Sequence, residues 1–181
     1  MFELPQIIGY VAMAICILSF QAKTQKGVVL LQCFSTCLFA THFFLIKAYS
    51  GAILNFICLI RSIIYTQRQD KKWAQSKVWI GVFTFLTFVS YFLTVFVLTP
   101  ADKRVLTLFL VELLPTIGNV VTTFSTRMEN AKLVRRYSLI ASPLWLSYNI
   151  INASIGGAIT ETFSIISIFI GMLRLDFKKE K

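Results

Sequence analysis

Seven long apolar segments dominate this sequence and constrain its fold more than any other feature. They cover residues 5–22, 28–46, 50–67, 78–99, 105–126, 136–153 and 156–173. Each is close to the roughly 20 mostly apolar residues that an α-helix needs to cross a lipid bilayer. Only short polar segments separate them. The sequence therefore predicts an all-α membrane protein with seven transmembrane helices.

The composition supports a membrane location. Hydrophobic residues make up 56% of the chain, charged residues make up 14%, and the mean hydropathy is +0.72. A soluble domain is typically about 45–50% apolar and about 25% charged, so the excess apolar surface is expected to face lipid. The first apolar segment follows the acidic Glu3, and no small-residue cleavage site follows it. We therefore expect this segment to remain in the membrane as a span and not to act as a signal peptide.

The basic residues are distributed asymmetrically between the two sides of the predicted bundle. If the N-terminus is outside, 14 of the 18 Lys and Arg residues lie on the inner side: Lys23, Lys26, Arg68, Lys71, Lys72, Lys77, Arg127, Lys132, Arg135, Arg136, Arg174, Lys178, Lys179 and Lys181. The outer side receives Lys47, Lys103 and Arg104, and Arg61 lies within the third segment. Cytoplasmic loops are enriched in Lys and Arg, so an outside N-terminus and a cytoplasmic C-terminus are predicted. This distribution accounts for the net charge of +10 without nucleic-acid binding.

An internal repeat emerges when the chain is shifted by 106 residues against itself. The segment from Leu38 to Ile63 then aligns with that from Leu144 to Phe169. Both copies contain a leucine, an aromatic residue and a second ring, then Gly-Ala, then a polar residue three positions later. The matching elements are Leu38-Phe39-x-x-His42 and Leu144-Trp145-x-x-Tyr148, Gly51-Ala52 and Gly157-Ala158, and Asn55 and Glu161.

The repeat predicts two parallel three-helix units joined by a linker helix, a 3+1+3 plan. The first repeat covers residues 1–67, the cytoplasmic loop and linker helix cover 68–104, and the second repeat with its basic tail covers 105–181. Parallel repeats of this kind commonly hold their substrate at the repeat interface.

Polar residues recur at helical spacing inside the later apolar segments. They are Glu112, Thr116, Asn119 and Thr123 in the fifth, Ser138, Ser142, Trp145, Asn149 and Asn152 in the sixth, and Glu161 and Ser164 after Gly157 in the seventh. An exposed polar group in hydrocarbon costs several kcal/mol, so these faces are expected to point into the protein. For Ser and Thr the simpler interpretation is helix bridging, worth about 0.6 kcal/mol each.

The two intramembrane acids, Glu112 and Glu161, require a partner, a proton or water, because a charge at the bilayer centre costs at least about 2.5–3.5 kcal/mol. Two arrangements satisfy Glu112 and Arg61. Either the two side chains form an ion pair, or Arg61 extends to the inner surface and Glu112 to the outer one.

No pattern in the chain indicates an enzyme, and we expect no metal and no cofactor. His42 is the only histidine, no nucleophile lies beside a base, and there is neither a glycine-rich phosphate loop nor a metal-ligand spacing. The four cysteines lie within apolar segments and are interpreted as buried apolar residues. His42 is interpreted as a packing residue, with a proton relay as the alternative.

Several short motifs together resemble the YgjV-type bacterial inner-membrane proteins. They are Gly9-Tyr10-Val11-Ala12, the run Leu18 to Lys23, the run Leu38 to Leu45, and Gly51-Ala52-x-x-Asn55. The resemblance covers nearly the whole chain and implies the bacterial inner membrane as its location. More distantly, the chain is similar to the PQ-loop superfamily, which includes the SWEET and SemiSWEET sugar transporters and the PnuC vitamin-precursor transporters. In that comparison Asn55 and Glu161 fall where sugar-transporting members carry paired pocket asparagines.

The PQ-loop resemblance implies a small-solute transporter with a pocket between the repeats. The expected pocket residues are Phe39, His42, Asn55, Glu112, Asn119, Trp145, Tyr148, Asn149 and Glu161. Trp145 would stack on the solute, Asn55 would hydrogen-bond it, and Glu161 would bind the solute or a coupling proton. The expected partners are the lipid bilayer and a small polar solute: a sugar, a nucleoside or a cationic amine.

The alternative function is a membrane receptor, scaffold or chaperone on the same fold, without transport. A pocket of about 300 Å³ or more that opens to one side would favour transport. A solid interior would favour the alternative.

Overall fold

The computed structural model describes residues 3–19, 25–67, 70–128 and 130–173, and this part of the chain is helical with no strand. The helices are α1 (Leu4–Ser19), α2 (Gln25–Leu45), α3 (Tyr49–Thr66), α4 (Lys72–Gln75), α5 (Val78–Phe92), α6 (Leu106–Ser125), α7 (Ala131–Ile151) and α8 (Ile155–Gly171). A π-helical stretch, Leu93–Leu98, continues α5, and a single 3-10 turn covers Ala101–Lys103. The all-α prediction is confirmed for the described residues.

Two differences from the expected helix bounds have clear causes. α7 begins at Ala131, before the expected residue 136, because the side chain of Asn130 caps it by accepting a hydrogen bond from the Lys132 N–H at 2.9 Å. The expected segment began only at residue 136 because it was chosen for its apolar residues, and the first turns of α7 are basic. The polar run 67–77 contains the short helix α4, which packs on the start of α5 through a hydrogen bond from Trp79 Nε1 to the Trp73 carbonyl.

Three helical segments are long and apolar enough to cross a bilayer by length and composition: Tyr49–Thr66, Val78–Leu98 and Leu106–Ser125. Shorter apolar helical stretches cover Leu4–Leu18, Leu30–Leu45 and Ile155–Gly171. Large apolar side chains are exposed along these helices, and they include Phe85, Val97 and Leu106. An apolar surface of this extent fits a protein whose solvent is lipid.

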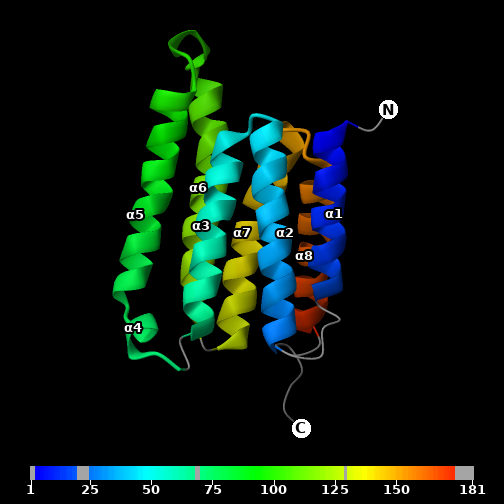
Figure 1. Cartoon of the computed structure of the whole chain (residues 1–181), viewed down its shortest axis with the longest axis vertical. Helices are drawn as coiled ribbons and strands as arrows, with labels where there is room; N and C mark the ends of the chain where they lie inside the picture. Colours follow the sequence, from blue (N-terminus) through cyan, green and yellow to red (C-terminus); the bar gives the residue numbers. More distant parts are fainter. Residues whose placement is uncertain (1–2, 20–24, 68–69, 129, 174–181) are drawn as a thin grey trace.

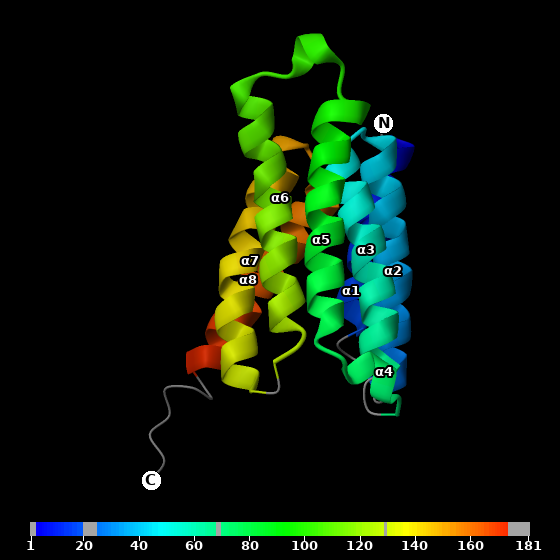
Figure 2. The ribbon, with the colours of Figure 1, turned by 90° about the vertical axis from the view of Figure 1, so that its left-hand side faces the viewer.

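Six of the helices form a closed ring. Each of α1, α2, α3, α6, α7 and α8 packs against two neighbours in the ring, with α3 beside α6 and α8 beside α1. Helix α5 stands outside the ring and packs on α3 and α6, which places it at one edge of the bundle (Figures 1 and 2).

The two halves of the ring contain the same helical hairpin. α2 and α7 have bounds that differ by 106 residues at both ends, and α3 and α8 start 106 residues apart. The connecting turns also correspond, because Lys47 has a φ of 63° and Ala153 has a φ of 52°. Each turn is closed by the same bond, from the Ala48 N–H to the Phe43 carbonyl and from the Ser154 N–H to the Asn149 carbonyl. Positive φ is uncommon outside glycine, so its recurrence at matched positions strengthens the repeat.

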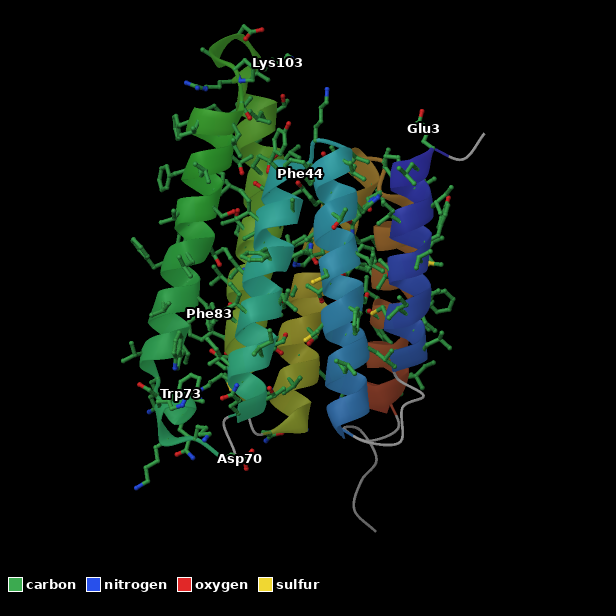
Figure 3. The ribbon with its side chains drawn as sticks, viewed as in Figure 1. Glu3, Phe44, Asp70, Trp73, Phe83 and Lys103 are labelled. Carbon is green, nitrogen blue, oxygen red and sulfur yellow. The ribbon has the colours of Figure 1, made fainter. Side chains whose placement is uncertain are left out.

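The helices turn at two opposite ends of the bundle. We call the end at the top of Figure 1 the upper face; it holds the start of α1 and the turns after α2, α5 and α7. The lower face holds α4 and the turn between α6 and α7. Glu3 and Lys103 lie at the upper face, and Asp70 and Trp73 lie at the lower face (Figure 3).

Candidate functional site

A cavity of about 260 Å³ lies inside the ring, between α2 and α3 of the first half and α6, α7 and α8 of the second. Its lining combines aromatic rings, hydroxyls, amides and one acid. The lining residues are Phe39, Phe43, Asn55, Cys58, Thr122, Ser138, Ala141, Ser142, Trp145, Asn149, Gly157, Thr160, Glu161 and Ser164.

Five of the nine expected pocket residues line this cavity: Phe39, Asn55, Trp145, Asn149 and Glu161. Asn55 follows the first residue of α3 by six positions, and Glu161 follows the first residue of α8 by six positions. The two residues therefore stand at equivalent heights in the two halves and border the same space.

Helix packing explains how Trp145 reaches the cavity wall. A side chain at Gly118 of α6 would place its Cβ 2.9 Å from Trp145 Cδ1, closer than atoms can approach. The absence of a side chain at Gly118 lets the indole lie against α6. Trp145 also meets Tyr148 edge to face, with ring centroids 6.1 Å apart.

His42 and Tyr148 do not line the cavity; both are fully buried at its upper end, next in sequence to the lining residues Phe43 and Asn149. His42 Nδ1 lies 2.7 Å from the Pro5 carbonyl and Nε2 lies 2.9 Å from Ser154 Oγ. A carbonyl can only accept, so Nδ1 carries the hydrogen. The Tyr148 hydroxyl accepts the Gly51 N–H at 3.0 Å, a donor in the first turn of α3 that has no partner within its own helix.

These two contacts are equivalent under the repeat, because His42 and Tyr148 are 106 residues apart. Each ring belongs to the second helix of one half and reaches the start of the third helix of the other half. We call this pair of contacts the upper clasp. It joins the two halves near the upper face, at the upper end of the cavity.

Asn119 is also absent from the lining and belongs to a buried polar layer between α3 and α6. Arg61, which is 2% exposed, donates to Asn119 Oδ1 at 3.2 Å and to Thr123 Oγ1 at 2.6 Å. Asn119 Nδ2 in turn donates to Thr87 Oγ1 of α5 at 2.8 Å. Neutral groups therefore bind the guanidinium, and this layer connects α3, α5 and α6.

Neither arrangement expected for Arg61 and Glu112 is found in the described part of the chain. Arg61 contacts Asn119 and Thr123, which follow Glu112 on α6 by seven and eleven residues, a difference in height of about 10–16 Å. Asn119 and Thr123 are the side chains at the height of Arg61, so Arg61 binds them and reaches neither Glu112 nor the surface. Glu112 is 6% exposed and lies near Tyr91 and Tyr148. Its Oε2 has no hydrogen-bond partner among the described residues.

A second cavity of about 520 Å³ adjoins the first at the lower end of α1, α7 and α8. The two cavities share the lining residues Ser138, Ser142, Thr160 and Ser164. Side chains at the upper end of the first cavity, such as Phe43 and Asn149, are buried, whereas Thr122 and Ser138 toward the lower end are half-buried. The first cavity is therefore more accessible from the lower face.

The helical spacing predicted the polar faces of α7 and α8, but the expected pocket residues did not include Ser138, Ser142, Thr160 and Ser164. Cys58 was also missed, although it follows Asn55 by three residues on the same face of α3. The helical spacing could have identified Cys58, whereas Thr122 and Phe43 could only be found from the packing of the helices.

The comparison with protein families matches residues 3–179 to the Imp-YgjV model, described as a bacterial inner membrane protein. The chain belongs to this family. The match covers nearly all of the sequence, and it confirms the resemblance expected from the motifs. No curated protein and no solved structure matches the chain. As an Imp-YgjV member with apolar helices, the chain is an integral protein of the bacterial inner membrane.

Proposed function

We propose that this Imp-YgjV protein is a small-solute transporter of the PQ-loop type. In this proposal the chain crosses the membrane seven times, with α1–α3 and α6–α8 as parallel repeats and α5 as the linker helix. The upper face is periplasmic and the lower face is cytoplasmic. The solute binds in the cavity between the two halves.

The single observation that carries the proposal is the cavity bordered by Asn55 and Glu161 at equivalent positions of the two repeats. Repeat interfaces near the membrane midplane are where transporters with internal repeats hold their solutes. The volume of about 260 Å³ is slightly below the roughly 300 Å³ at which typical small-molecule sites start. A solute of a few heavy atoms fits this size.

The two ends of the cavity support an alternating-access cycle. The upper clasp, with His42 on Ser154 and Tyr148 on Gly51, closes the periplasmic end. Toward the cytoplasm, the adjoining cavity between α1, α7 and α8 provides a route to the solute site. In the cycle, the clasp separates and the lower ends of the helices come together, which exposes the site to the periplasm.

A receptor, scaffold or chaperone remains the second candidate. The observation that favours it is the cavity volume, which is slightly below the range of typical ligand sites. Such a protein would bind its partner through an exposed face and would not move solutes.

Reconstitution into liposomes tests the transport proposal. Uptake of radiolabelled glucose, uridine and n-butylammonium should show transport of at least one solute by the native protein. Thr160 is half-buried and lines the cavity, so the indole of Thr160→Trp should fill the cavity and abolish uptake. Phe85→Trp, on the exposed face of α5, is the matched control and should keep the native rate. A native protein that moves none of the three solutes would contradict the proposal and favour the second candidate.

A further inference from the structure

We infer that the cavity selects molecules that carry an ammonium group, with Glu161 as the counter-charge. This inference rests on the proposed function, since it names the substrate class of the same cavity. It depends on three properties of the lining: its charge, its hydrogen-bonding groups and its aromatic rings.

The cavity lining contains one group that can carry a negative charge, the Glu161 carboxylate. Within the described residues, Glu161 is the only acidic side chain in the lining, and no Lys, Arg or His lines it. The nearest basic side chain on α3 is Arg61, which does not itself line the cavity. Its guanidinium donates to Asn119 and Thr123 of α6 and to the Sγ of the lining residue Cys58, at 2.7 Å. Arg135 lines the adjoining cavity at the lower end of α7. A carboxylate in a low-dielectric interior needs a cation, a proton or water, and a cationic ligand can supply the first of these.

The hydroxyl groups of the lining offer acceptors and few donors. Thr122, Thr160 and Ser164 each donate their hydroxyl hydrogen to a carbonyl four residues earlier in their own helix, at 2.8, 2.8 and 3.0 Å. Their remaining capacity toward the cavity is therefore the oxygen lone pairs.

The two amides add to this excess of acceptors. Asn55 Nδ2 donates to the Gly51 carbonyl at 2.9 Å, which leaves its Oδ1 as an acceptor. Asn149 Oδ1 has no hydrogen-bond donor among the described residues. An ammonium group has three N–H donors and no acceptor, which complements this lining. An anion has acceptors only and would not complement this excess of acceptors.

The aromatic residues complete the recognition of a cation. Phe39, Phe43 and Trp145 border the same cavity as Glu161. The faces of aromatic rings attract cations, and Trp is the strongest of them. The lining therefore combines a carboxylate with aromatic rings, the two kinds of group that bind an organic cation.

Binding to the purified full-length protein tests the inference. The probes are n-butylammonium, its neutral isostere butan-1-ol, and glucose, each measured by calorimetry. The native protein should bind n-butylammonium more tightly than either neutral probe. Glu161→Gln should weaken n-butylammonium binding by about tenfold or more, because hydrogen bonds to a charged group are the stronger ones. Its affinity for butan-1-ol should stay the same.

Two further variants separate loss of charge from loss of fold. Glu161→Asp keeps the carboxylate and should retain n-butylammonium binding within a few-fold of the native protein. Glu3→Gln, at the exposed start of the bundle (Figure 3), removes the same charge outside the cavity and should have no effect.

The outcomes of this experiment distinguish the inference from the transport proposal. Glucose binding tighter than n-butylammonium, no binding of the cation, or equal cation binding in native protein and Glu161→Gln would each overturn the inference. Liposome uptake of glucose alone would leave transport standing and overturn the ammonium assignment. Glu161-dependent binding without liposome uptake would support the ammonium site and overturn the transport proposal.

Discussion

Gly156 is a residue at which α1 and α8 come into direct backbone contact. A Cβ at this position would lie 2.5 Å from the Gly9 carbonyl oxygen and 2.7 Å from its carbon. Backbone atoms cannot rotate away as a side chain can, so the two helices would have to separate. Small residues at such crossings allow membrane helices to pack closely. The α1 to α8 contact, which closes the ring, therefore depends on Gly156.

Gly156→Ala is expected to destabilise the protein by about 1–3 kcal/mol, the usual cost of overpacking. Gly81→Ala is the matched control, because a Cβ there meets no atom within 4 Å. The control should be neutral or stabilising by up to about 1 kcal/mol, since alanine favours the helix. Thermal unfolding of both variants in detergent checks this prediction. Equal stability of the two variants would show that α1 can shift without cost.

At the scale of the helices, the hairpins α2–α3 and α7–α8 exchange contacts through the upper clasp. His42 contacts Ser154, the residue just before α8, and Tyr148 accepts the Gly51 N–H in the first turn of α3. Each ring therefore binds the start of a helix in the other half. The residues differ between the repeats, but the geometry is the same. This explains why two rings occupy equivalent positions in otherwise dissimilar sequences.

Tyr148→Phe is expected to loosen the upper clasp, because it leaves the buried Gly51 N–H without an acceptor, at a cost of about 1–3 kcal/mol. The readout is the labelling rate of a single cysteine at the buried Ser50, in a variant with the native cysteines replaced, by an impermeant thiol reagent. The rate should rise about tenfold.

Tyr49→Phe is the control, because the Tyr49 hydroxyl makes no hydrogen bond within the described ranges. It should leave the labelling rate unchanged. An unchanged rate in Tyr148→Phe as well would mean that the upper end does not open at this contact.

For the whole molecule, the distribution of basic residues predicts how the bundle is oriented in the membrane. Lys47, Lys103 and Arg104 lie at the upper face, whereas Lys71, Lys72, Lys77, Arg127 and Lys132 lie at the lower face. A cytoplasmic lower face satisfies the positive-inside rule. In the proposed orientation, the adjoining cavity of α1, α7 and α8 lies on the cytoplasmic side.

Reporter fusions check the orientation. Alkaline phosphatase inserted at Ala101, in the upper loop, should be active, because this enzyme works only in the periplasm. A fluorescent protein fused after Lys181, or inserted at Asp70 at the opposite end (Figure 3), should be fluorescent in the cytoplasm. The reverse pattern would refute the orientation and the assignment of the upper clasp to the periplasm.

The sequence by itself determined the helical character, the apolar surface, the repeat offset and the family. These properties follow from local composition and from spacing along one chain, so Asn55 and Glu161 could be paired before any coordinates were known. The tertiary structure alone decided the role of each polar residue. His42, Tyr148 and Asn119 bind other helices in place of the cavity, and Arg61 binds Asn119 and Thr123 instead of Glu112. A helical face shows which side chains point inward, but the heights and rotations of neighbouring helices decide which partners they meet.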